Sequence, residues 1–106
     1  MISSRIEKYK NGWFIGDFDP SLLKTKHFEC GVKFMKQGDV NPAHYHSESV
    51  EINYVCYGKV MFNGILFESD SIILIEKNEC SEFKCVENCC LFIVRDGSNV
   101  KDKYEC

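Results

Sequence analysis

The sequence predicts an all-β protein, a small barrel or sandwich, and two observations lead to this fold class. From Phe28 onward the chain consists of short apolar or alternating stretches rich in Val, Ile, Phe and Tyr, separated by turn residues. This pattern is typical of consecutive β-strands. The strands follow one another at nearly regular spacing, and a closed barrel or a sandwich removes the edges that such strands would otherwise expose. We therefore expect no long helix.

The individual elements follow from the same patterns. Residues 13–18 are apolar enough for an edge strand, and residues 20–23 are expected to form a single turn. Asn63-Gly64 predicts a hairpin, because a two-residue type I′ turn needs positive φ at both positions. A polar tail is expected at 98–106, from which Tyr104 could dock on the body. Strands are expected near residues 28–36, 43–46, 50–57, 59–63, 65–68, 71–75, 80–85 and 90–95.

Length and composition indicate one globular domain over residues 1–106. The chain has 106 residues, which is an ordinary size for a single domain. Hydrophobic residues make up 44% of it and charged residues 27%, so intrinsic disorder and low-complexity structure are not expected. One hydrophobic core is therefore predicted.

Charge and hydropathy exclude two classes of partner. The 13 basic and 16 acidic residues give a net charge of −3, the wrong sign for a surface that follows nucleic-acid phosphates. The longest apolar runs, 72–75 and 89–94, are far shorter than the roughly 20 residues of a membrane-spanning helix. The first residues lack the apolar stretch of a secretory signal. We expect a cytoplasmic protein, although a mature secreted form would look the same.

The seven cysteines are an odd number and have no regular spacing. Secreted domains held together by disulfides usually have an even number of cysteines. Free thiols are therefore expected. Cys80, Cys85, Cys89 and Cys90 could form a zinc cluster, but their gaps lack the two-residue knuckle of structural zinc sites. Buried cysteines that act as small hydrophobic side chains are the favoured interpretation.

Two of the three histidines lie two residues apart in a predicted strand. Because the side-chain period of a strand is two, His44 and His46 share one face and Tyr45 points to the other. Glu51 begins the next strand and could add a carboxylate beside both imidazoles. Two histidines and one carboxylate form a facial set of metal ligands with open positions for water or substrate. Glu48, inside the apparent turn, is a weaker candidate ligand.

The spacing of these residues resembles the first motif of the cupins. Gly38, five residues, His44, one residue, His46, four residues, Glu51, six residues and Gly58 match every anchor of that motif. The resemblance covers about residues 28–95. It implies a jelly-roll β-barrel with the two histidines and the glutamate pointing inward onto a metal ion.

The second cupin motif is degenerate in this chain. When the motif is aligned on the turn after Phe67, its five anchor positions carry Asp70, Glu76, Asn78, Ser81 and Cys85. Asp and Asn still suit turns, so the backbone can follow the same path. The histidine that would be the fourth protein ligand falls at Ser81, and a serine hydroxyl is a poor metal ligand beside an imidazole.

Three outcomes are open at the position of the missing histidine. Water fills it and leaves a three-residue site; Glu79, Glu82 or Cys80 reaches in from the same segment; or metal binding has been lost. The strand register that would separate these neighbours is not fixed by the sequence. The three-residue site is the favoured interpretation.

The resemblance implies a small metal-binding cupin, favoured as an enzyme for a small polar metabolite such as a sugar derivative or an oxo acid. Isomerase or epimerase, lyase and dioxygenase chemistry all suit an open-sided divalent ion, whether Fe, Mn, Ni, Zn or Co. Tyr54, Tyr57 and Glu82 are candidates for a general base. Lys33, Lys36 and Arg95 could hold an anionic substrate, although nothing local distinguishes them from other cations.

Two further functions are compatible with the sequence. A non-catalytic cupin could sense or store a small ligand or a metal, and a scaffold cupin could bind a partner through its sheet. Many cupins pair through their sheets, so the resemblance also implies a homodimer.

Overall fold

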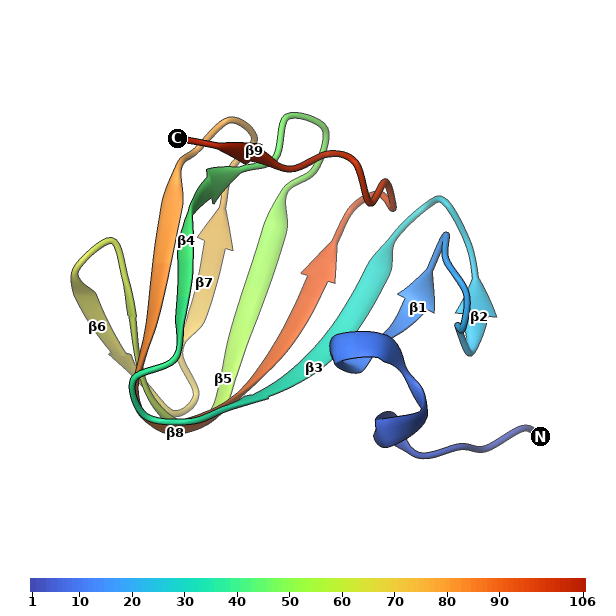
Figure 1. The fold of residues 1–106 in the computed structure, drawn as a ribbon, viewed down its shortest axis with the longest axis horizontal. Coiled ribbons are helices and arrows are strands. Elements are labelled where there is room, and N and C mark those ends of the chain that lie inside the picture. The colour runs from blue at the N-terminus through green and yellow to red at the C-terminus, as the bar shows by residue number, and fades with distance from the viewer.

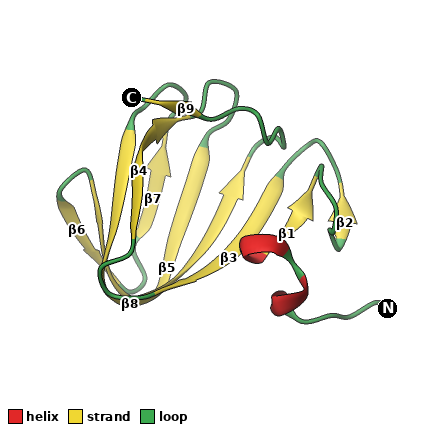
Figure 2. Ribbon diagram, viewed as in Figure 1, coloured by secondary structure: helices red, strands yellow, loops and turns green.

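The computed structural model describes all of residues 1–106 and is built almost entirely of strands (Figures 1 and 2). Two short 3₁₀ turns in the N-terminal segment are its only helical parts. The elements are the turns η1 (Ile6–Lys8) and η2 (Lys10–Gly12) and the strands β1 (Trp13–Gly16), β2 (Leu23–Lys24), β3 (Glu29–Met35), β4 (Val40–Tyr45), β5 (Glu51–Phe62), β6 (Ile65–Glu68), β7 (Ile72–Ile75), β8 (Ser81–Arg95) and β9 (Tyr104–Glu105). The predicted all-β fold class is confirmed.

Two long strands organise the sheet. β8 pairs with β3 through its second half and with β4 through its first half, while β5 pairs with it along both halves. β6 and β7 pair with the two ends of β5. β8 bends at the base of the view in Figure 1, so that one hydrogen-bonded sheet curls back on itself. This curling encloses the interior in which the candidate site lies.

The sequence predicts four separate strands where the structure has these two. Stretches 50–57 and 59–63 merge into β5, and stretches 80–85 and 90–95 merge into β8. Gly58 does not end β5 because its positive φ of 90° and a shift in register let the ladder to β8 continue past it. The glycine thus marks a β-bulge rather than a turn.

The Asn63-Gly64 hairpin forms as predicted. Asn63 has φ 51° and Gly64 has φ 78°, and Phe62 pairs with Ile65 across the turn. Positive φ at both positions is the conformation that a type I′ turn requires.

Both ends of the chain pair more closely with the sheet than the sequence indicates. A strand forms within 13–18, because β1 pairs with β3, but it is not the edge of the sheet, since β2 pairs on its other side. The single turn expected at 20–23 is replaced by an irregular connection, and Leu23 opens β2, which runs parallel to β1. The predicted polar tail forms β9, which lies beside β4 (Figure 1). Tyr104 stacks on Tyr45 with ring centroids 5.2 Å apart.

The hydrophobic core lies inside the curled sheet and is formed by side chains on its inner face. It contains aliphatic, aromatic and cysteine side chains at alternate positions of the long strands, which is the period that one buried face requires. Its buried members are Val55, Val60, Phe62, Ile75, Phe83, Cys85, Cys89, Leu91 and Ile93. Neither helical turn has the length or apolar character that crossing a membrane would need.

Candidate functional site

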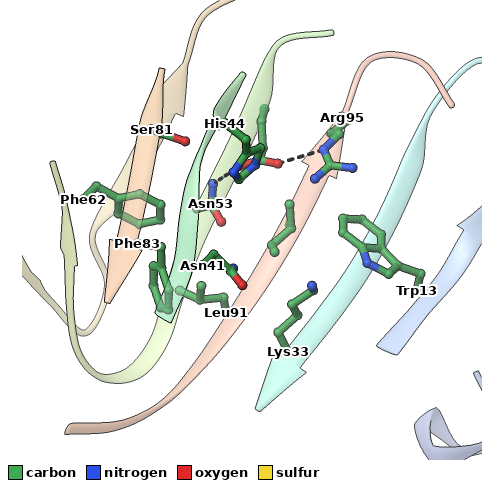
Figure 3. A pocket seen from close by; sticks show the side chains of 12 residues that line it. Trp13, Lys33, Asn41, His44, Asn53, Phe62, Ser81, Phe83, Leu91 and Arg95 are labelled. Carbon is green, nitrogen blue, oxygen red and sulfur yellow. Dashed lines mark hydrogen bonds and ion pairs between the residues drawn. The ribbon is translucent and has the colours of Figure 1, made fainter. Parts of the chain in front are cut away.

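The predicted ligands converge at one end of the core. His44 is near the end of β4, His46 follows that strand, and Glu51 opens β5. A cavity of about 40 Å³ adjoins His44 and Glu51, which is room for little more than one water molecule. It is lined by Trp13, Lys33, Asn41, His44, Glu51, Asn53, Phe62, Ser81, Phe83, Leu91, Ile93 and Arg95 (Figure 3).

Both imidazole rings are oriented by main-chain carbonyl groups. Nδ1 of His46 lies 2.5 Å from the carbonyl oxygen of Asp102, and Nδ1 of His44 lies 2.9 Å from that of Pro42. Because a carbonyl group only accepts hydrogen bonds, each Nδ1 carries the proton and donates it. In the neutral rings this leaves the lone pair on Nε2. The ring centroids are 5.1 Å apart.

The Nε2 atom of His46 has no hydrogen-bond partner although it is buried. It lies 3.8 Å from Oε1 of Glu51. Burial is the main cause that lowers the pKa of His44; the hydrogen bond to Pro42 opposes it, and the nearby charges of Lys103 and His46 lower the pKa further. The neutral imidazole is the form that binds metal ions. A histidine ring whose Nδ1 donates to a carbonyl group, and whose Nε2 is left free, is a common arrangement for a metal ligand.

Glu51 is already engaged by two other side chains. Its Oε1 accepts a hydrogen bond from Nε of Arg95 at 2.7 Å, and its Oε2 accepts one from Nδ2 of Asn53 at 2.9 Å. Burial raises the pKa of Glu51, but the charge of Arg95 and these hydrogen bonds outweigh it and hold the pKa below its ordinary value. Glu51 is therefore a carboxylate at neutral pH.

The donor set suits a divalent ion in its chemistry, because it offers two imidazole Nε2 atoms and one carboxylate. No three His, Cys, Asp or Glu side chains are close enough together to form a complete metal-binding group. Oε1, the Glu51 oxygen that lies near Nε2 of His46, is also the oxygen that accepts the hydrogen bond from Arg95. A metal ion would have to share Glu51 with the guanidinium group.

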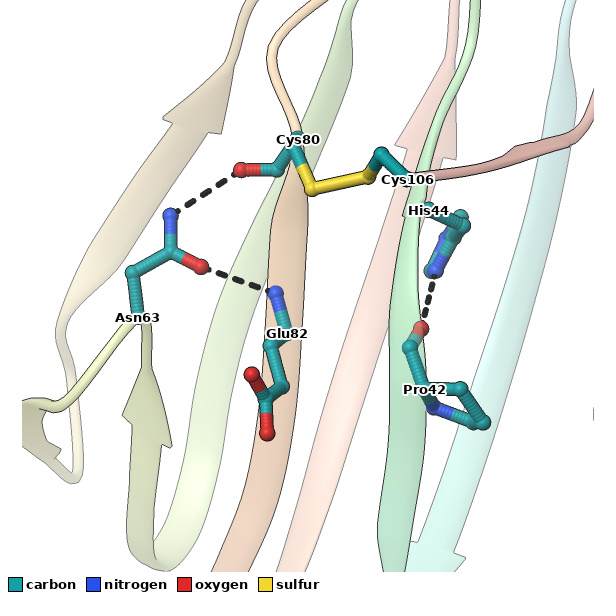
Figure 4. The surroundings of a disulfide bond; sticks show 6 residues. All are labelled: Pro42, His44, Asn63, Cys80, Glu82 and Cys106. Carbon is teal, nitrogen blue, oxygen red and sulfur yellow. Dashed lines mark hydrogen bonds between the residues drawn. A yellow bond between two sulfur atoms is a disulfide. The ribbon is translucent and has the colours of Figure 1, made fainter.

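The structure places Ser81 where the alignment puts the missing histidine, directly opposite His44 in the β4–β8 ladder. None of the three possible replacement ligands reaches this place. The carboxylate of Glu79 accepts a hydrogen bond from the backbone of Glu76, and Glu82 is exposed because it alternates with the buried Ser81. Figure 4 shows the Glu82 carboxylate pointing away from His44.

The third possible replacement, Cys80, is bonded to Cys106 instead. Their Cα atoms are 6.4 Å apart (Figure 4). This corrects the expectation that all seven cysteines are free: the other five are free, and four of those are buried. The sequence carried no signal for the pair, because its members are 26 residues apart and meet only when β9 lies on β4.

The candidate general bases do not face the cavity. Tyr54 lies between the inward-facing Asn53 and Val55, and its hydroxyl donates a hydrogen bond to Asp70 outside the barrel. Tyr57 is 48% exposed, and Glu82 is exposed as described above. Strand parity explains the positions of Tyr54 and Glu82, because alternate residues of a strand point to opposite faces. Tyr57 has the parity of the buried Val55, but the register of β5 on β8 shifts between these two residues and leaves Tyr57 exposed.

The third histidine, His27, and the weaker carboxylate candidate, Glu48, both lie outside the site. His27 is exposed in the connection between β2 and β3. Glu48 is exposed, and its carboxylate accepts a hydrogen bond from Asn99.

Asp102 is the site residue that the sequence analysis missed. Its carboxylate accepts hydrogen bonds from the backbone and hydroxyl of Ser47 and from the backbone of Glu48, at 2.8, 2.8 and 2.9 Å. Its carbonyl group holds His46. The partners are 54 to 56 residues away in sequence, so no local pattern could have revealed them.

Sequence comparisons find neither a matching family model nor a matching curated protein. Solved structures do match. KdgF from Halomonas sp. matches with a TM-score of 0.65 and 15% identity, over 73% of this chain and 76% of that one. An RmlC-like cupin from Shewanella frigidimarina matches with a TM-score of 0.66 and 12% identity, over 73% and 72%.

A third match is the DMSP lyase DddQ from Ruegeria pomeroyi, with a TM-score of 0.71 and 12% identity. The aligned region covers 88% of this chain and 49% of DddQ, so the chain spans about half the length of that enzyme. At such identities the likeness concerns the fold. The curled sheet and these matches together show that this chain has the cupin fold, a jelly-roll double-stranded β-helix.

Proposed function

We propose that this cupin binds a divalent metal ion through His44, His46 and Glu51 and is an enzyme for a small polar metabolite, a sugar derivative or an oxo acid. One observation carries the proposal. The buried Nε2 atom of His46 has no partner in the protein, and an unsatisfied buried polar atom costs free energy unless something binds it. A metal ion beside Glu51 would satisfy it.

A bound ion with open coordination positions would supply Lewis-acid polarisation of a substrate oxygen or, as Fe(II), a site for dioxygen. The chain's own groups would prepare the ligands for it. The carbonyl groups of Pro42 and Asp102 hold the imidazole rings, and Asn53 orients the Glu51 carboxylate. Isomerase, epimerase, lyase and dioxygenase reactions are all compatible with this arrangement. A lyase is among the matching folds.

The metal content of the purified protein tests the proposal. Protein prepared without chelator and under low oxygen is expected to carry near-stoichiometric Fe, Mn, Ni, Zn or Co. The His44→Ala/His46→Ala variant should lose it. His27→Ala is the matched control and should keep the metal, because His27 is exposed outside the site. Folded, metal-free protein that also refuses added Fe(II), Mn(II), Ni(II), Zn(II) and Co(II) would contradict the proposal.

A non-catalytic ligand- or metal-binding module is the second candidate. It is favoured by one observation: none of Tyr54, Tyr57 and Glu82, the candidate bases, lines the cavity. One set of assays distinguishes an enzyme from a binding module. Turnover of a substrate panel that disappears in His46→Ala supports the enzyme, whereas ligand-induced thermal stabilisation without turnover supports the binding module.

We further propose a cytoplasmic setting, supported by the five free cysteines, because disulfide-rich frameworks belong to oxidising compartments. The exposed Cys80–Cys106 pair provides the test. Cells would be lysed in an alkylating reagent, and mass spectrometry would count the modified cysteines. Recovery of the pair mainly as free thiols is expected, and quantitative recovery of the disulfide would count against a reducing compartment.

A further inference from the structure

A second, larger cleft opens beside the histidines. Its volume is about 470 Å³, enough for a small metabolite. It lies between the N-terminal segment, strand β3 and the segment that follows β8. His46 also lines it. Trp13, Lys33 and Arg95 line both this cleft and the small cavity. The cleft therefore lies directly beside the candidate metal site.

The carboxylates that line this cleft all have partners in the protein. Glu29 binds Arg95 at 2.5 Å and Ser98 at 2.9 Å. Asp19 pairs with Lys24 at 3.1 Å, and Asp102 accepts the three hydrogen bonds described above. None of these carboxylates needs a cation from the cleft.

The lysines that line the cleft have no such partners. Lys10, Lys33 and Lys103 all reach it, and none of them takes part in an ion pair or a side-chain hydrogen bond. The charge of Arg95, by contrast, is matched by Glu29 and Glu51. An excess of unmatched positive charge therefore faces this cleft, although the chain as a whole has a net charge of −3.

Lys33 is the best placed of these cations. Its ammonium lies 5.4 Å from the centroid of the Trp13 ring, and Figure 3 shows it directed to the cavity side, between Asn41 and Trp13. Burial lowers the pKa of Lys33, and the nearby Arg95 and Lys103 lower it further. A bound anion would offset both effects. Cζ of Arg95 also lies over the Trp13 ring, 4.7 Å from its centroid. The indole ring forms a flat wall of the cleft.

We propose that this cleft binds the anionic group of a small organic acid, with Lys33 as the principal counter-ion, Lys103 at the rim and Trp13 as the apolar wall. The inference deepens the proposed function, on which it rests for the neighbouring metal site. It selects an oxo acid or an acidic sugar over a neutral sugar. A carboxylate and a phosphate share the chemistry that the lysines recognise, so the test includes both.

The single tryptophan of the chain is a reporter inside the cleft. Chelator-treated, metal-free protein would be titrated with pyruvate, with inorganic phosphate and with glucose, and followed by Trp13 fluorescence and by isothermal titration calorimetry. We expect saturable binding of pyruvate, of phosphate or of both, and none of glucose. Stronger binding of pyruvate identifies a carboxylate group, and stronger binding of phosphate identifies a phosphate ester.

Two lysine variants test the role of Lys33. Lys33→Met, which keeps the length of the side chain, should weaken anion binding about tenfold or more, as expected for a lost charge-assisted contact. Lys33→Arg should restore most of it. Lys36→Met is the matched control, because Lys36 follows the same strand but does not line the cleft. It should bind the anion as the wild type does.

The His44→Ala/His46→Ala variant separates this inference from the proposed function. Anion binding that survives in this variant, without metal, supports the cleft independently of the metal site. The inference is overturned if neither anion binds by either readout while metal binding is intact, if glucose binds as well as the anions, or if Lys33→Met binds them as tightly as Lys36→Met does. Circular dichroism of each variant would verify the fold.

Discussion

Arg95 connects two carboxylates that would otherwise be buried without a counter-ion. Its Nη1 binds Glu29 at 2.5 Å and its Nε binds Glu51 at 2.7 Å, and the two glutamate side chains are only 5% and 9% exposed. Removing one partner of a buried ion pair leaves an uncompensated charge. The guanidinium group is therefore a structural requirement of the site, whatever else the site binds.

We expect Arg95→Met to destabilise the protein by about 3 kcal/mol at pH 7. Urea unfolding of the variant and the wild type measures this difference. Lys59→Met is a suitable control, because Lys59 forms an exposed pair with Glu87 at 3.5 Å and exposed pairs contribute about 0 to 1 kcal/mol. Equal losses of stability in the two variants would contradict the role assigned to Arg95.

The ion pair between Arg95 and Glu51 also predicts how the stability of the protein depends on pH. Burial alone would raise the pKa of Glu51, but Arg95 and Asn53 hold it below the ordinary value of 4.5. A depressed folded-state pKa stabilises the protein above the unfolded pKa, and that stability is lost as pH falls through the folded pKa. Wild-type stability should therefore decline below about pH 4.5. In Arg95→Met, protonation relieves the buried charge, so the difference between the two proteins should shrink at pH 4.

At the scale of elements, the C-terminal strand depends on distant contacts. β9 has only two residues, and its pairing to β4 is reinforced by the hydrogen bonds of Asp102 and, when Cys80 and Cys106 are oxidised as in this structure, by their disulfide. An isolated two-residue strand would not be stable by itself. Since Asp102 also holds His46, the order of this segment bears directly on the candidate site.

We expect reduction of Cys80–Cys106 to lower the stability by about 3 to 4 kcal/mol, the loop-closure value for a bridge that spans 26 residues. Thermal unfolding with and without dithiothreitol measures the change. Cys106→Ser should reproduce the reduced state and show no further response to dithiothreitol. The exposed free Cys56 provides the control, because Cys56→Ser should keep the full response.

The bulge in β5 predicts a difference between two glycines. Both Gly58 and Gly64 have positive φ, 90° and 78°. A Cβ atom at Gly58 would lie 2.3 Å from the carbonyl oxygen of Asn88, whereas a Cβ atom at Gly64 would meet no atom within 4 Å. The strained backbone is common to both, but only Gly58 has a backbone neighbour that would have to move.

Gly64→Ala should therefore cost about 1 kcal/mol, the usual penalty of the left-handed conformation. Gly58→Ala should cost about 3 kcal/mol or more, because the penalty of displacing β8 is added. Chemical denaturation of the two variants tests this order. A smaller loss for Gly58→Ala than for Gly64→Ala would show that β8 yields easily at the bulge.

At the scale of the whole molecule, one outer face of the sheet is apolar. Ile72 and Leu74 of β7 are 70% and 54% exposed, and Ile52 of β5 is 39% exposed. Ile52 is the register partner of both Leu74 and Val94, so the face continues across β7, β5 and β8. Apolar faces of this kind mark association surfaces.

We expect a second copy of the chain to cover this face and form a homodimer. Light scattering after size exclusion should give the dimer mass for the wild type at micromolar concentration. Ile72→Lys/Leu74→Lys should be monomeric, since burying two charges in the interface is unfavourable. Val40→Lys, at a residue 60% exposed on β4, should leave the dimer intact. A monomeric wild type would refute this expectation.

The sequence by itself determined the parts of the protein that depend on local chemistry. Strand periodicity placed His44 and His46 on one face with Glu51 beside them, and Asn63-Gly64 specified its hairpin, because side-chain alternation and turn conformation are properties of neighbouring residues. The spacing of the first motif indicated the cupin fold through its resemblance to that family. Ser81, which aligns with the missing histidine of the second motif, lies opposite His44 in the structure.

Only the tertiary structure decided which distant residues meet. The register of β5 on β8 sets Arg95 opposite Glu51, and the C-terminal segment returns Asp102 to Ser47 and Cys106 to Cys80. A register shift between β5 and β8 also leaves Tyr57 exposed, although it has the parity of the buried Val55. Strand register and chain return depend on the packing of the whole sheet, so alternation within one strand cannot specify them. The carboxylate of the predicted metal site is therefore shared with Arg95 for a reason that no single segment contains.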